Sequence, residues 1–191
     1  MIRPYHEDRI FSAGELRHEE FAGAEFERCT FRSSSWMGVD LSKAQFTECT
    51  FEQCDLSNAV VDGTSFRTVL FKGCKLLGVR FDRCHSFLLR LRFEQCRLDF
   101  ASFRSLVLKG TRFSGCTLTE ADFGGCKLAS AVFDDCNLAG AVFDGTDLTG
   151  ADLREARNFI IDPETNQVKG AHFALHGLPG LLMQHRIKVE G

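Results

Sequence analysis

The chain has 191 residues, of which 44% are hydrophobic and 26% charged, and its formal net charge is −3. This length suits a single domain, and a charge so close to zero does not by itself mark a polyanion. The N-terminus is charged and lacks the apolar segment of a secretory signal, and no apolar run is long enough to span a membrane. We therefore expect a cytoplasmic protein that makes no contact with the membrane.

From position 11 onward, a large apolar residue occurs at every fifth position. The series runs from position 11 to position 81 and again, two residues out of step, from 93 to 153, giving 28 such central positions. A period of five matches neither an α-helix nor a flat strand. The pattern indicates a repeat architecture, in which residues 1–10 cap the N-terminal end.

The residues around each central position complete a five-residue unit. Two residues before it there is usually a small side chain, which faces inward with it because alternate residues of an extended chain point the same way. The other three positions carry most of the charged and polar residues and face water. Of the 17 glycines, 11 follow a central residue by two positions, where a turn with positive φ is expected. Short extended pieces with a corner every five residues predict a polygonal coil.

The two series do not join cleanly, because a register shift of two residues falls near 82–92. One interpretation is a bulged corner that the coil accommodates. The other is a small protruding lip whose Phe87 or Arg90 contacts a partner.

Residues 158–191 follow the repeat and are expected to cap its C-terminal end. Pro179 suits the first turn of a short helix. The segment acts either as a cap alone or as a cap that also forms a dimer contact, because a short apolar helix cannot bury itself. The side chains expected in that contact are Phe173, Leu178, Leu181, Leu182, Met183 and Ile187.

Neither the nine cysteines nor the six histidines indicate catalysis or metal binding. Every cysteine falls on the inward small position, which is typical of a buried apolar residue, and no CxxC motif is present. The histidines are scattered and match no catalytic motif. We expect a protein that is not an enzyme and has no cofactor and no metal. A thiol-based redox sensor is the weaker alternative.

Charge is distributed unevenly along the chain. Residues 61–120 carry 11 basic and 5 acidic residues, whereas residues 121–160 carry 7 acidic and 3 basic ones. The seven acids all lie at outward positions and are the candidate partner-binding residues: Asp122, Asp134, Asp135, Asp144, Asp147, Asp152 and Glu155. An ordinary solvated surface is the alternative. The basic middle lacks a nucleic-acid-binding motif, so direct binding of nucleic acid is not expected.

The repeat resembles the pentapeptide-repeat proteins, whose unit is a small residue, Asp or Asn, then Leu or Phe, then two variable residues. Three stretches follow it closely: Ala121, Asp122 and Phe123; Cys136, Asn137 and Leu138; and Ala151, Asp152 and Leu153. The resemblance implies an all-β, right-handed quadrilateral parallel β-helix of about seven coils over residues 1–157. The short helical cap and dimerisation segment would then occupy residues 158–191.

Residues 64–79 and 172–182 are also similar to the Qnr-type quinolone-resistance proteins and the albicidin-resistance pentapeptide protein. That likeness implies a homodimer joined through its C-termini that mimics DNA and binds DNA gyrase or topoisomerase IV. It further implies protection of the enzyme from fluoroquinolones or albicidin. A general interaction scaffold with another partner is the alternative.

Overall fold

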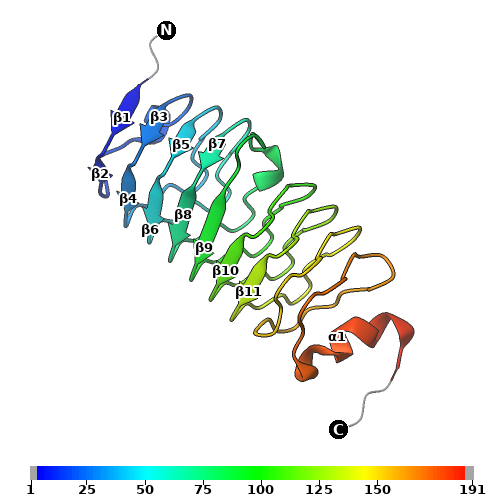
Figure 1. Cartoon of the computed structure of the whole chain (residues 1–191). Coiled ribbons are helices and arrows are strands. Elements are labelled where there is room, and N and C mark those ends of the chain that lie inside the picture. Colours follow the sequence, from blue (N-terminus) through cyan, green and yellow to red (C-terminus); the bar gives the residue numbers. More distant parts are fainter. Residues whose placement is uncertain (1–3, 188–191) are drawn as a thin grey trace.

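The computed structural model describes residues 4–187, so the outer ends of both expected caps lie outside it. The chain winds into a rod with four faces, and its two ends lie at opposite ends of the rod (Figure 1). We name the faces A to D in the order in which the chain meets them from β2 onward. The expected parallel β-helix is confirmed.

Face A carries a seven-stranded parallel sheet and face D a four-stranded one. The strands of face D are β1 (Tyr5–Glu7), β3 (Glu25–Glu27), β5 (Gln45–Thr47) and β7 (Ser65–Arg67). Those of face A are β2 (Ile10–Phe11), β4 (Thr30–Arg32), β6 (Thr50–Glu52), β8 (Val69–Lys72), β9 (Leu91–Glu94), β10 (Arg112–Ser114) and β11 (Val132–Asp134). Faces B and C are held by isolated parallel bridges such as Ser35 to Asp55 and Asp40 to Val60.

The helical segments are short and stand at the edges of this framework. Three-residue 3₁₀ segments occur at η1 (His18–Glu20), η2 (Phe81–Arg83), η3 (Leu175–Gly177) and η4 (Met183–His185), and the α-helix α1 covers Pro179–Leu182. Among residues 4–187 no helix has both the length and the apolar character needed to cross a bilayer.

All 28 central side chains are buried, as the five-residue period predicts. Parallel pairing of successive coils places like side chains directly above one another, so the phenylalanines form stacks along the rod axis. Phe113 lies between Phe93 and Phe133, with ring centroids 5.2 and 5.0 Å away. Stacked aromatic pairs contribute about 0.5–1.5 kcal/mol each beyond their burial. This interior leaves binding to the outside of the rod.

The corners have a left-handed backbone whether or not they carry glycine. The 11 glycines that follow a central residue by two positions all have positive φ. Residues such as Lys43, Gln53 and Ser105 adopt the same conformation at equivalent corners. The coil as a whole therefore sets the geometry of the corner, and glycine lowers the steric cost of the positive φ there.

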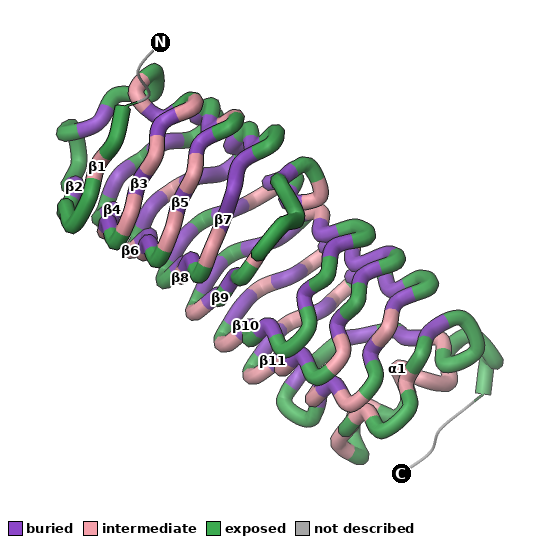
Figure 2. The backbone as a smooth tube through the Cα atoms, turned by 45° about the horizontal axis from the view of Figure 1, so that its top comes forward, coloured by how far each residue is buried: buried purple, intermediate pink, exposed green. Residues whose placement is uncertain are grey.

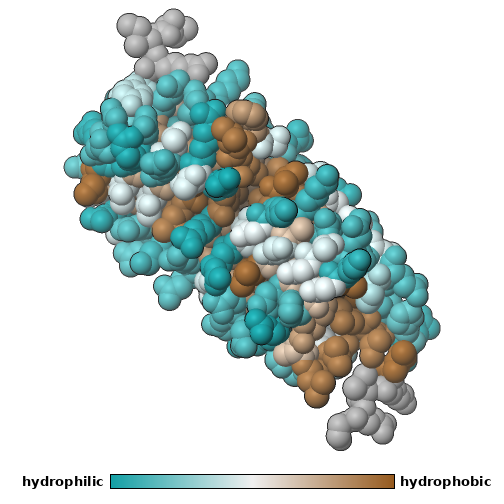
Figure 3. All heavy atoms as spheres, in the orientation of Figure 1, coloured by the Kyte–Doolittle hydropathy of each residue, from teal (hydrophilic) through white to brown (hydrophobic). Residues whose placement is uncertain are grey.

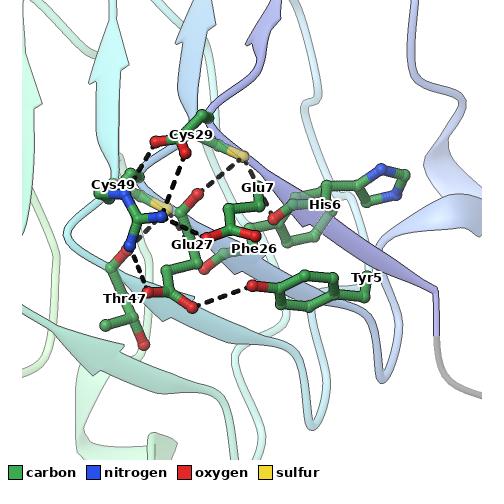
Figure 4. Close-up of polar contacts among 10 residues, drawn as sticks. Tyr5, His6, Glu7, Phe26, Glu27, Cys29, Thr47 and Cys49 are labelled. Carbon is green, nitrogen blue, oxygen red and sulfur yellow. Dashed lines mark hydrogen bonds and ion pairs between the residues drawn. The ribbon is translucent and has the colours of Figure 1, made fainter.

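A cluster of charged side chains ties the first coil to the next (Figure 4). The guanidinium of Arg28 donates to Asp8 at 2.8 Å and also contacts Glu7 and Glu27. The hydroxyl of Tyr5 donates to Glu27 at 3.1 Å. Residues 5–11 thus belong to the paired β-helix and not to a separate segment.

The spacing between paired residues changes at the register break. Ser65 pairs with His85, 20 residues on, whereas Val69 pairs with Leu91, 22 residues on. Two additional residues are therefore accommodated between His85 and Leu91. At the other end, pairing continues beyond 157, since Asp147 pairs with Gln167 and Asp152 with His172.

Replacing a stacked phenylalanine tests this account of the core. Phe113→Ala should lower the free energy of unfolding by about 3–5 kcal/mol, because it leaves a cavity in the axial stack. The matched control Phe87→Ala removes a ring that is 61% exposed and should change stability little. Urea unfolding followed by circular dichroism measures both, and equal midpoints for the two variants would contradict this account.

Candidate interaction surfaces

The structure divides the seven candidate acidic residues among three faces of the rod. Asp134 lies in β11 on face A, and Asp152 pairs with Val132 on the same face. Asp135 and Glu155 come one and three residues after these two acids, at the end of the same face. The remaining three lie elsewhere: Asp122 and Asp144 on face C, and Asp147 on face D. The four acids of face A form the largest of these groups.

Arginines from the same or neighbouring coils neutralise much of this acidic charge. Asp135 lies 2.7 Å from Arg157, and Asp122 lies 3.3 Å from Arg104. Two further pairs on face A join Asp152 to Arg154 at 2.7 Å and Asp134 to Arg112 at 3.9 Å. Among residues 4–187, Asp144 and Glu155 form no ion pair. The accessible negative charge is thus smaller than the count of acidic residues predicts.

Two carboxylates of this region, Asp147 and Asp152, have a lowered pKa. The hydrogen bonds from Arg154 lower the pKa of Asp152 to about 2. The hydrogen bond from the side chain of Thr149, with that from its backbone N–H, lowers the pKa of Asp147. Both carboxylates are therefore ionised at neutral pH, and the positive charge of Arg154 offsets that of Asp152.

The C-terminal segment is partly a cap and partly an exposed apolar surface. Leu181 and Phe173 pack against the core, with the Phe173 ring 5.5 Å from that of Phe159. The N–H of Ile161 donates to the carbonyl of Gly180 at 3.0 Å, which ties α1 to the last coil. These contacts close the end of the rod.

Four apolar side chains remain exposed on the outer side of this cap. The four are Leu175 (85% exposed), Leu178 (40%), Met183 (56%) and Ile187 (55%). All except Leu175 belong to the expected dimer contact. Leu182 is partly exposed. Figure 3 shows the resulting apolar area at the C-terminal end of the rod. Sequence reasoning missed Leu175, because it precedes the apolar run of the short helix.

The register break forms a protruding lip, which we define as residues 85–90. Phe87 and Leu88 are 61% and 57% exposed, and Leu88 has a φ of 58°. The N–H of Phe87 donates to Nδ1 of His85 at 3.2 Å, and Leu89 packs inward against the core. Figure 2 shows this exposed segment leading into β9. Both expected lip residues, Phe87 and Arg90, therefore face solvent.

All nine cysteines are buried and unpaired. Five of them stack in one column on face B: Cys54, Cys74, Cys96, Cys116 and Cys136. The residue that follows each of these cysteines pairs with its counterpart in the next coil, in the order Asp55, Lys75, Arg97, Thr117 and Asn137. Each thiol is close to a backbone carbonyl; Cys74, for example, donates to that of Phe51 at 3.3 Å. The sequence indicated only the last three members, because the register break hides the alignment of Cys74 with Cys96.

All nine thiols are shielded from solvent, and burial keeps three of them protonated at neutral pH. Burial raises the pKa of Cys49, Cys84 and Cys126 to about 12. Within residues 4–187, no group of three or more His, Cys, Asp or Glu side chains has the arrangement needed for a metal ion.

The native protein should therefore resist thiol reagents. Ellman's reagent should label the folded protein slowly and all nine cysteines after denaturation in guanidinium, because thiolates react and buried thiols rarely ionise. Absorbance at neutral pH, with and without denaturant, measures this difference. Rapid labelling of the native state would instead support the redox-sensor alternative.

The geometry defines a closed rod of five-residue units, and comparison with protein families agrees with it. The model described as "Pentapeptide repeats (8 copies)" matches residues 20–58 and 121–157. A second, described as "Pentapeptide repeat region", matches residues 44–123. Together they cover residues 20–157, which is most of the chain. The chain belongs to the pentapeptide-repeat family.

Solved structures share this fold at low sequence identity. Full-length QnrB1, described as a plasmid-mediated fluoroquinolone resistance protein, is 17% identical, with 96% of this chain and 100% of that chain covered and a TM-score of 0.52. A trypsin-treated QnrB1 variant is 21% identical, with 98% of each chain covered and a TM-score of 0.50. HetL of Nostoc sp. strain PCC 7120 is 18% identical over 90% of this chain and 86% of that chain, with a TM-score of 0.48. A search of curated proteins returned no match.

Proposed function

We propose that this protein is a non-enzymatic, cytoplasmic DNA mimic that binds DNA gyrase or topoisomerase IV and protects it from fluoroquinolones or albicidin. The observation that carries the proposal is the likeness in fold to full-length QnrB1, a fluoroquinolone resistance protein, along the whole of both chains. The resemblance of residues 172–182 to the same group supports it. The closed core supports a role in binding rather than catalysis.

The acids of face A are the part of the rod best placed to imitate DNA. Neighbouring coils are ~4.8 Å apart, so Asp134, Asp135, Asp152 and Glu155 put roughly one carboxylate every 2.4 Å along the axis. B-DNA carries one charge per ~1.7 Å. Glu155 forms no ion pair among residues 4–187, and Asp134 has the longest ion pair of face A, 3.9 Å to Arg112, so we assign the principal contact to these two acids. Asp144 lies on face C, turned away from that surface.

Charge reversal on two faces tests this assignment. Asp134→Lys with Glu155→Lys should raise the concentration needed to protect gyrase by about tenfold, because attraction becomes repulsion at the contact. The control Asp144→Lys reverses one charge on the opposite face and should change it little. Gyrase supercoiling in the presence of a fluoroquinolone, at low and at high salt, measures both variants. Equal losses would contradict the assignment to face A.

The same assay separates the topoisomerase proposal from its alternative. Rescue of supercoiling by the unmodified protein, fading as salt increases, is the expected result. Neither rescue nor inhibition at micromolar protein would leave a general interaction scaffold with another partner.

We also propose that the exposed apolar cap joins two copies of the chain. The candidate contact comprises Leu175, Leu178, Met183 and Ile187, with Leu182 at its border, while Phe173 and Leu181 support it from beneath. A two-fold axis here would bring the acidic coils of both copies close to one centre. A self-complementary patch of this kind is the usual basis of a symmetric dimer.

Polar substitutions in this contact should dissociate the dimer. Leu175→Glu with Met183→Glu should convert the species seen by analytical ultracentrifugation from dimer to monomer, because both side chains are more than half exposed and would place charge in an apolar interface. The control Met37→Glu alters a residue that is 63% exposed on face B and should leave the dimer intact. A monomeric unmodified protein at micromolar concentration would contradict the proposal.

A further inference from the structure

The register break leaves a groove where faces D and A meet. On face D the pairing from β7 ends at His85 and resumes only at Val107, which pairs with Lys127. Within the lip, the N–H of Arg90 donates to the carbonyl of Phe66 at 3.1 Å, but in the described chain residues 86–90 form no bridge to Val107. The resulting depression has a volume of about 640 Å³ and is lined by residues 68–70, 89–92, 107 and 109–111.

The floor of this groove is apolar. Val69 and Leu91 pair with each other in the sheet and are buried. Leu89 is part-buried against the core, and Val107 is 55% exposed at the edge. A side chain that entered the groove would therefore bury apolar surface on both itself and the wall.

The rim of the groove is basic. Arg90, Arg92 and Lys109 line it, and all three are exposed. None forms an ion pair with any residue in 4–187, whereas many other cations of the rod do, such as Arg104, Arg154 and Arg157. In the part of the chain that the structure describes, no carboxylate lines the groove.

Two of the neighbouring arginines repel each other. Arg92 pairs with Arg112 of the next coil, so their side chains stand side by side on face A. Like charges directly opposite each other on a sheet destabilise it. Arg112 has Asp134 at 3.9 Å, whereas Arg92 has no ion-pair partner within residues 4–187. An anionic ligand in the groove would relieve this repulsion.

We propose that the groove binds a short acidic segment of a protein partner, with an apolar side chain on the floor and carboxylates at Arg90, Arg92 and Lys109. The lining contains no aromatic side chain, so it offers no platform on which nucleic-acid bases could stack. A free phosphate would contact the basic rim but would leave the apolar floor exposed to water. This inference does not rest on the topoisomerase proposal.

Binding of a defined peptide tests the inference directly. The probe is a fluorescein-labelled peptide of alternating glutamate and leucine, about six residues or roughly 20 Å long. Fluorescence anisotropy with the full chain should show saturable binding that weakens with salt. The matched peptide with glutamine in place of glutamate should bind at least about tenfold more weakly, because the charge attraction is lost.

Two pairs of substitutions locate the site. Arg90→Glu with Lys109→Glu should raise the Kd by about tenfold or more. Lys43→Glu with Lys169→Glu makes the same change in net charge at exposed positions away from the groove and should raise it much less. Val107→Ser should weaken binding about threefold by removing part of the floor. Circular dichroism checks the folding of each variant.

Three results would overturn the inference. The first is the absence of saturable binding of the glutamate peptide at millimolar concentration. The second is an equal loss of affinity in the two pairs of charge-reversal variants. The third is tighter binding of oligothymidylate, or displacement of the peptide by inorganic phosphate alone, which would make the groove an anion or nucleic-acid site.

Discussion

Axial stacking of large apolar side chains is the constraint on which the rest of this structure depends. Parallel coils ~4.8 Å apart place each residue above its counterpart in the coil below. Phenylalanine rings tolerate this arrangement well, as the 5.1 Å separation of Phe103 and Phe123 shows. A polar residue at the same position in every coil would be buried without a hydrogen-bond partner, and each copy would add its own desolvation cost. The inward positions are therefore restricted to apolar and small side chains, and the outward positions are free to vary.

Function in such a rod must come from its surface or from its irregularities. The five-residue unit buries two side chains and exposes three, and the interior is filled along its whole length. At the lip of residues 85–90 and at the C-terminal cap, several large apolar side chains are exposed to solvent. Both lie where the regular pairing stops, because there the stacking constraint no longer applies.

The charges show how strongly the coil register matters. Seven acids within 121–160 look like one acidic patch when counted along the chain. In the rod, a shift of five residues moves a side chain to the next face, so Asp147 and Asp152 lie on different faces. Pairs such as Asp135 with Arg157 join residues 22 apart. The surface that a partner meets is thus set by neighbours on adjacent coils and not by neighbours in sequence.

The sequence by itself determined the repeat, the inward positions of all 28 central residues and nine cysteines, and the turns with positive φ. These features are local, because each five-residue unit repeats the same pattern of apolar, small and polar side chains. Only the tertiary structure decided which acids share a face, which arginines neutralise them, and that Cys74 aligns with Cys96. It also decided that the break forms a lip beside a basic groove. Those outcomes depend on pairing offsets of 20 or 22 residues, which are set by how one coil packs on the next.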